Sequence, residues 1–296
     1  MSFMKGVWRL LKRCYILGYN KKKNIFGMNP LLISTFFIIL TAVLASMFRM
    51  TVKKCLGDGI VKQMLLEFIA TAELCAICFE LVIVADNYGV WVYALYLFLL
   101  TLWWARVWEI ESACPYSEME KVVEGTQEAL KALYVIIAQI LGGILIYYYV
   151  QLLWSMELTE THRGKVDEEC KADLQHHWLQ RTIIEILGTF ISTFPKRYFV
   201  KCCQPYGAPF CILWDIMFAL MGKLLHVGAV FMNAAIGTSF NWKCTPLWHI
   251  ALAFWLGSNS GALTAFLLVK KLRCRPLASL RRNVSEGSAS IRSTRT

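Results

Sequence analysis

Charged side chains are scarce in this sequence: Asp, Glu, Lys and Arg together make up 17% of its 296 residues. Apolar and aromatic residues make up 57%, and the mean hydropathy is +0.49. A soluble domain of this length needs a larger charged fraction to cover its surface. The composition therefore excludes an ordinary soluble domain and indicates an α-helical protein that crosses a membrane several times.

Other signatures are also missing. The 11 cysteines follow no Cys/His metal-ligand spacing, so we predict no metal site, no redox motif and no cofactor. No His, Asp and Ser residues converge for catalysis, so we predict no enzymatic activity. No cleavable signal peptide is expected, because the first apolar run begins at Leu31. The net charge of +11 lies mainly at the chain ends and in short loops, which favours membrane lipid as a partner and not nucleic acid.

Long apolar runs are what the sequence does contain. A helix needs about 20 apolar residues to cross about 30 Å of hydrocarbon. The run at 177–195 is the weakest because it carries Arg181 and Glu185. The runs lie at 31–48, 63–85, 88–105, 132–156, 177–195, 210–229 and 246–269.

An internal repeat relates the two halves of the chain. The stretch LLEFIAT at 65–71 returns as IIEILGT at 183–189. With three spanning helices in each half, the copies have opposite orientations, which is the inverted-repeat plan of many channels and transporters. Three pairs share an offset of 118 positions: Glu67 with Glu185, Thr71 with Thr189, and Gly143 with Gly261.

Each half also contains a short segment that cannot span a membrane, at 111–125 and at 228–240. Pro115 suits the first position of a helix, and Asn233 suits an N-cap. Non-helical backbone at membrane depth is tolerated where it lines a cavity. We therefore predict two re-entrant half-helices whose N-terminal dipole ends face a conduction path.

The predicted fold is an all-α polytopic bundle of six transmembrane helices plus two half-helices in an inverted repeat, with an extra N-terminal hydrophobic segment. Lys and Arg counts place the C-terminus in the cytosol. We divide the chain into a basic amphipathic segment (1–29), an extra hydrophobic segment with a linker (30–62), two channel half-repeats (63–156 and 157–269) and a basic, Ser-rich, disordered tail (270–296). The extra run at 31–48 either crosses the membrane or dips and returns, and the sequence leaves both alternatives open.

These motifs resemble the aquaporin family, and most closely its divergent intracellular superaquaporin branch, which includes aquaporin-11/12-like and insect members. The family carries an Asn-Pro-Ala triplet in each half. Here Cys114-Pro115-Tyr116 replaces the first triplet. The second reads Asn233-Ala234-Ala235, or Met232-Asn233-Ala234 if the offset of 118 is kept.

The resemblance assigns further roles. It makes Glu67 and Glu185 scaffold carboxylates that accept hydrogen bonds from the re-entrant loops; the alternative is that each lies at a helix end and reaches water. The arginine that follows the family's second triplet is Ala235 or Ile236 here, so the constriction is expected to be wider and more apolar.

Two basic residues of the fifth core helix are further candidates for the constriction. The resemblance places a filter residue between Met221 and Lys223, so Lys223 and His226 are candidates to approach the constriction, where a lysine would supply the missing positive charge. The alternative is that Lys223 pairs with Asp215 or reaches water. Neither alternative is decided by the sequence.

The predicted topology places Cys170 and Cys244 outside the cytosol, where disulfides persist. The outer loops of this fold converge over the pore mouth, so we predict a disulfide between these two residues, with two free thiols as the alternative.

The resemblance implies a passive channel for water and small neutral solutes such as glycerol and hydrogen peroxide. It also implies a homotetramer in the endoplasmic reticulum or another intracellular membrane, with the plasma membrane as an alternative. The rival function is a non-conducting membrane scaffold that has kept the fold, since both triplets are degenerate.

Overall fold

The computed structural model describes residues 29–166, 178–202, 207–224 and 231–272, which form helices and connecting loops without a strand. Five segments are long and apolar enough to cross a membrane: α2 (Pro30–Cys55), α3 (Ile60–Tyr88), α4 (Val90–Val107), α6 (Ala129–Ser155) and Leu247–Lys271. The last comprises α10 (Leu247–Ile250), the π-helix η2 (Ala251–Leu256) and α11 (Gly257–Lys271). The others are α5 (Pro115–Glu124), α7 (Trp178–Cys202), α8 (Gly207–Leu224) and α9 (Ala234–Asn241). The all-α polytopic membrane fold is thus confirmed.

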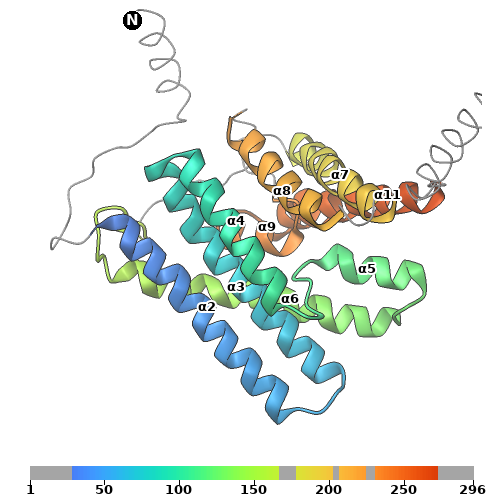
Figure 1. Cartoon of the computed structure of the whole chain (residues 1–296), viewed down its shortest axis with the longest axis horizontal. Coiled ribbons are helices and arrows are strands. Elements are labelled where there is room, and N and C mark those ends of the chain that lie inside the picture. The colour runs from blue at the N-terminus through green and yellow to red at the C-terminus, as the bar shows by residue number, and fades with distance from the viewer. Residues whose placement is uncertain (1–28, 167–177, 203–206, 225–230, 273–296) are drawn as a thin grey trace, which may run out of the picture.

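The order of elements shows the internal repeat. Helices α3, α4, α5 and α6 are followed by α7, α8, α9 and the segment from α10 to α11. Each half-helix also packs against the opposite half: α9 contacts α3 and α6, and α5 contacts α11 (Figure 1). The rings of Phe79 on α3 and Phe240 on α9 stack with centroids 4.1 Å apart. The half-helices therefore tie the two halves together.

Glycines permit the closest helix pairs. A Cβ atom on Gly142 of α6 would lie 2.6 Å from the carbonyl oxygen of Phe68 on α3. A Cβ atom on Gly261 of α11 would lie 2.4 Å from the carbonyl oxygen of Ile186 on α7. Because backbone cannot yield as a flexible side chain does, only glycine fits at these two crossings. They occupy equivalent places in the two halves, so the structure pairs Gly261 with Gly142 and not, as the offset of 118 predicted, with Gly143.

The extra N-terminal run forms one unbroken helix, α2, of 26 residues. The Asn29 side chain caps it by accepting a hydrogen bond from the N–H of Leu31 (3.0 Å), and Pro30 occupies the first turn. At 1.5 Å per residue the helix is about 39 Å long. It lies alongside α3 (Figure 1), and Arg49 near its C-terminal end meets Glu73 of α3. The helix therefore has the length to cross the membrane, and it does not dip and return within residues 30–55.

A buried ion pair anchors α2. The guanidinium of Arg49, 2% exposed, lies 2.5 Å from the carboxylate of Glu73. The same carboxylate accepts hydrogen bonds from the indole N–H groups of Trp103 (3.2 Å) and Trp108 (3.3 Å). A carboxylate facing lipid is costly, so α2 supplies the charge that Glu73 requires.

Replacing Arg49 with methionine tests this anchor. Arg49→Met leaves a buried carboxylate without its cation, which is expected to lower the free energy of unfolding by about 3–5 kcal/mol. Thermal unfolding of purified protein in detergent measures the effect. Arg106→Met, at an exposed position of α4, is the matched control, and adding Glu73→Gln to Arg49→Met should restore most of the loss. Equal stability of Arg49→Met and Arg106→Met would contradict the anchor.

Candidate functional site

The two loops that precede the half-helices share an unusual backbone conformation. Ala113 (φ 50°) and Met232 (φ 53°) both adopt the left-handed region, which costs a non-glycine residue roughly 1–2 kcal/mol. The next residue in each loop, Cys114 or Asn233, is the N-cap of the half-helix. This equivalence pairs Cys114 with Asn233, an offset of 119, so the insertion-free alignment through Met232 does not match the geometry.

In the first half, Glu67 of α3 holds this loop in place. Its fully buried carboxylate accepts hydrogen bonds from the backbone N–H groups of Ser112 (2.8 Å) and Ala113 (2.9 Å). The side-chain amide of Gln139 on α6 donates a further bond of 2.9 Å. Glu67 therefore connects α3, α6 and the loop, and it does not reach water at a helix end.

In the second half, Glu185 of α7 makes the equivalent bonds. It accepts from the N–H groups of Phe231 (3.0 Å) and Met232 (3.2 Å). Its third donor is charged: the guanidinium of Arg181, one helical turn away, lies 2.9 Å from the carboxylate. The guanidinium also lies 5.6 Å and 5.4 Å from the ring centroids of Phe231 and Phe254. The sequence singled out Arg181 only as a weakness of its apolar run, although its spacing of four residues from Glu185 is a local signal for that ion pair. Its contacts with Phe231 and Phe254 depend on the fold.

Asn233 joins the two loops directly. Its side-chain oxygen caps α9 by accepting from the N–H of Ala235 (2.9 Å), and its amide nitrogen donates to the carbonyl oxygen of Ala113 (2.8 Å). Cys114 is the N-cap residue of α5 but makes no capping hydrogen bond with its side chain, and Pro115 is the first residue of the helix. The N-terminal ends of α5 and α9 therefore approach each other inside the bundle.

The remaining motif residues take different places. Ala234 and Ala235 are fully buried. Tyr116 lies beside Arg197 of α7, whose guanidinium carbon is 5.9 Å from the ring centroid. Arg197 also pairs with Glu120 of α5. The first motif thus contains an aromatic side chain next to a cation.

Only one of the three residues expected to line the constriction has a described side chain. Ile236 is partly buried on α9, whereas the side chain of Lys223 and all of His226 lie outside the described residues. Asp215, considered above as a partner of Lys223, is 2.6 Å from Lys196 of α7. That ion pair joins α7 to α8.

Two cysteines on α3 were overlooked at the sequence level. Cys75 and Cys78 have the CxxC spacing, and both are free thiols here. Cys75 is fully buried, and a buried structural cysteine is inert in redox chemistry. Within the described ranges, no group of three or more His, Cys, Asp or Glu residues is arranged to hold a metal ion.

A buried Thr–His–Glu arrangement was also missed. Nε2 of His162 lies 2.8 Å from the Glu80 carboxylate, and Nδ1 lies 2.6 Å from the Thr159 hydroxyl. Both His162 and Thr159 are fully buried. A catalytic triad needs access for a substrate, so this arrangement serves instead to fasten the loop after α6 to α3.

Replacing Glu67 with glutamine tests the scaffold role. The Glu67 carboxylate accepts from the N–H groups of Ser112 and Ala113 and from the Gln139 amide. A glutamine in its place has one NH₂ group where the carboxylate has an oxygen, so that group would face a donor without an acceptor. Glu67→Gln is expected to lower the free energy of unfolding by about 1–3 kcal/mol, measured by thermal unfolding. Glu128→Gln, at an exposed position, is the control. Unchanged stability of Glu67→Gln would show that the loop does not depend on the carboxylate.

The predicted disulfide is open to a direct test. Cys244 is disulfide-bonded in the structure, and its expected partner, Cys170, lies outside the described residues. Peptide mapping without reductant should recover Cys170 and Cys244 as one cross-linked pair that separates on reduction. Alkylation of both thiols without reductant would refute the pairing.

Comparison with known proteins gives an independent view. No protein-family model matches the chain. Aquaporin-11 of Milnesium tardigradum is 24% identical over 254 residues, which cover 84% of this chain and 91% of the relative. Aquaporin-11 of Equus caballus is 26% identical over 208 residues (69% and 75%), and that of Mus musculus is 23% identical over 242 residues (80% and 88%). Together with the all-helical, multi-pass fold, these relatives support the assignment of the chain to the aquaporin family of membrane channels, in its superaquaporin branch.

Proposed function

We propose that this channel passively conducts small neutral solutes, namely water, glycerol and hydrogen peroxide. The observation that carries the proposal is the contact between the two re-entrant loops, where Asn233 donates to the carbonyl oxygen of Ala113. It brings the N-terminal ends of α5 and α9 together. Each end carries a partial positive charge from the helix dipole. Two such ends at one point repel cations while leaving neutral solutes unaffected.

The motif residues have different roles in this proposal. Asn233 faces the path through its side chain, and Cys114 begins the opposite half-helix. Ala235 occupies a place after the N-cap where a longer side chain would narrow the passage. With no arginine there, we expect a wider and more apolar constriction, which Ile236, Lys223 and His226 are the candidates to line.

A non-conducting scaffold is the second candidate function. The amide nitrogen of Asn233 already donates to Ala113, so only one of its two hydrogens is left for a solute. Cys114 offers a weak donor where the family has a second asparagine. A chain that keeps the loop geometry but lacks solute donors would retain the fold without rapid flux.

Solute flux through proteoliposomes discriminates the two functions. A channel should accelerate stopped-flow swelling with water or glycerol, or the entry of peroxide, above protein-free liposomes. Flux at the level of lipid alone for all three solutes would favour the scaffold.

Asn233→Asp tests the pore assignment. Aspartate also caps helices, so α9 should still begin at the same place. The new carboxylate loses the bond to the Ala113 carbonyl and adds negative charge. A change of about 1 kcal/mol in the barrier alters flux about fivefold. Asn233→Ser keeps a neutral cap and separates the effect of charge from the effect of the lost amide. Unchanged flux through folded Asn233→Asp would remove Asn233 from the pathway.

The proposal extends to assembly and location. We expect a homotetramer in an intracellular membrane such as the endoplasmic reticulum, both carried over from the family resemblance. Exposed apolar side chains on α2, α4 and α6 are available for lipid and subunit contacts. Native mass spectrometry and organelle co-localisation measure the two properties, and a monomer or a plasma-membrane signal would refute them.

A further inference from the structure

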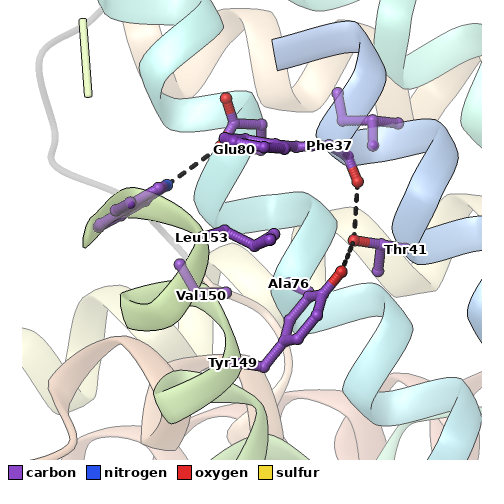
Figure 2. Close-up of a pocket in the computed structure, with 9 residues that line it drawn as sticks. Phe37, Thr41, Ala76, Glu80, Tyr149, Val150 and Leu153 are labelled. Carbon is purple, nitrogen blue, oxygen red and sulfur yellow. Dashed lines mark hydrogen bonds between the residues drawn. The ribbon is translucent and has the colours of Figure 1, made fainter. Parts of the chain in front are cut away.

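The first half of α2 lies beside the last half of α6. The rings of Phe37 on α2 and His162, in the loop that follows α6, have centroids 5.2 Å apart. The hydroxyl groups of Thr41 on α2 and Tyr149 on α6 lie 3.1 Å apart and point toward each other (Figure 2). The start of α2 is therefore near the end of α6.

The other end of α2 is fixed as well. Lys53, in the last turn of α2, lies 3.0 Å from the carboxylate of Glu109, which follows the C-terminal end of α4. The buried pair of Arg49 with Glu73 lies one turn before it. Helix α2 is thus held along its length, and at about 39 Å it is longer than the roughly 30 Å of hydrocarbon in a bilayer.

The C-terminal end of α11 lies near the start of α6. Residues 125–128 join α5 directly to α6, and Glu120 of α5 pairs with Arg197 in the last part of α7. One turn further along α7, Lys201 donates to the carbonyl oxygen of Leu272 at the end of α11 (3.0 Å). The start of α6 and the ends of α7 and α11 therefore lie at the same surface.

Helix α6 separates these two sets of contacts. It has 27 residues and is apolar enough to cross a membrane, and its length of about 40 Å places its two ends at opposite surfaces of the bilayer. Since α2 starts near the end of α6 and α11 ends near its start, Asn29 and Leu272 lie on opposite sides of the membrane.

We propose that α2 crosses the membrane and that the two basic ends of the chain therefore lie on opposite sides of it. Because Lys and Arg counts place the C-terminus in the cytosol, residues 1–29 lie outside the cytosol. This segment contains seven Lys and Arg residues and no Asp or Glu, whereas the tail at 270–296 contains eight Lys and Arg residues and one Glu. An anionic partner of residues 1–29 must therefore be reached from the non-cytosolic side.

The positive-inside rule applied to residues 1–29 alone predicts the reverse orientation. If α2 did not cross, however, the buried carboxylate of Glu73 would lose Arg49 and face lipid, which is costly. The last turn of α2 also carries Lys53 and Lys54, whose place on the cytosolic side agrees with the rule. The contacts of α2 within the bundle, and not the charge of the segment before it, set its direction.

Labelling of two native cysteines tests the proposal. Cys14 lies in the N-terminal segment and Cys274 in the tail, and both are outside the described residues. Sealed vesicles of one orientation are reduced and then treated with a membrane-impermeant maleimide, and labelled peptides are identified by mass spectrometry. We expect vesicles that label Cys274 to leave Cys14 unlabelled, inverted vesicles to do the opposite, and permeabilised vesicles to label both. Labelling of both cysteines in one sealed preparation would overturn the proposal.

Variants keep the test decisive. Cys14→Ser and Cys274→Ser each remove one labelled peptide and so confirm its identity. If Cys14 is not labelled even in permeabilised vesicles, Ser2→Cys supplies a second reporter for the same segment, and Cys274 stays the comparison. Neither reporter lies in the proposed pore, so the result is the same whether or not the protein conducts a solute.

Discussion

The hydrogen bonds between two glutamates and the loops before the half-helices are the interaction on which the channel architecture depends. A re-entrant loop has no helical or strand partner for its N–H groups, and each unsatisfied group in the membrane interior costs several kcal/mol. Glu67 and Glu185 each accept two such N–H groups. They also hold Ala113 and Met232 in a left-handed conformation that these residues would otherwise avoid. Without these acceptors, α5 and α9 would lose the position that brings their ends together.

The two halves solve the same problem with different chemistry. A neutral amide, Gln139, completes the partners of Glu67, whereas the guanidinium of Arg181 completes those of Glu185. The first half-helix begins at a cysteine and the second at an asparagine that caps its own helix and contacts the opposite loop. The backbone symmetry therefore persists while the side chains diverge. The loops before the two half-helices thus keep one backbone geometry although both triplets depart from the family pattern.

The extra helix α2 is fastened to the bundle by polar contacts, which distinguishes it from a simple apolar anchor. Glu73 and Glu80 lie two turns apart on α3, and both carboxylates are buried. Arg49 of α2 pairs with the first, and the Thr41 hydroxyl of α2 shares a hydrogen bond with the Tyr149 hydroxyl of α6. Helices in a bilayer gain little from apolar contact with one another, because lipid tails are equally apolar. Buried ion pairs and hydrogen bonds thus provide a reason for α2 to occupy one position only.

The sequence by itself determined the order of the apolar helices and the inverted repeat. It also pointed to Glu67, Glu185 and Asn233, whose side chains bond the two re-entrant loops in the fold. These features depend on local composition and on matches at a fixed offset, which a single chain displays. It did not determine the partners of Arg49 and His162, because each pairs with a carboxylate of α3 that is distant in the sequence and is reached only in the folded bundle. The CxxC spacing of Cys75 and Cys78 was visible but overlooked. Only the tertiary structure decided the alignment of the second motif. The left-handed residue and the N-cap that follows it show where each half-helix begins. A fixed offset between two stretches of sequence cannot reveal that one loop contains an extra residue.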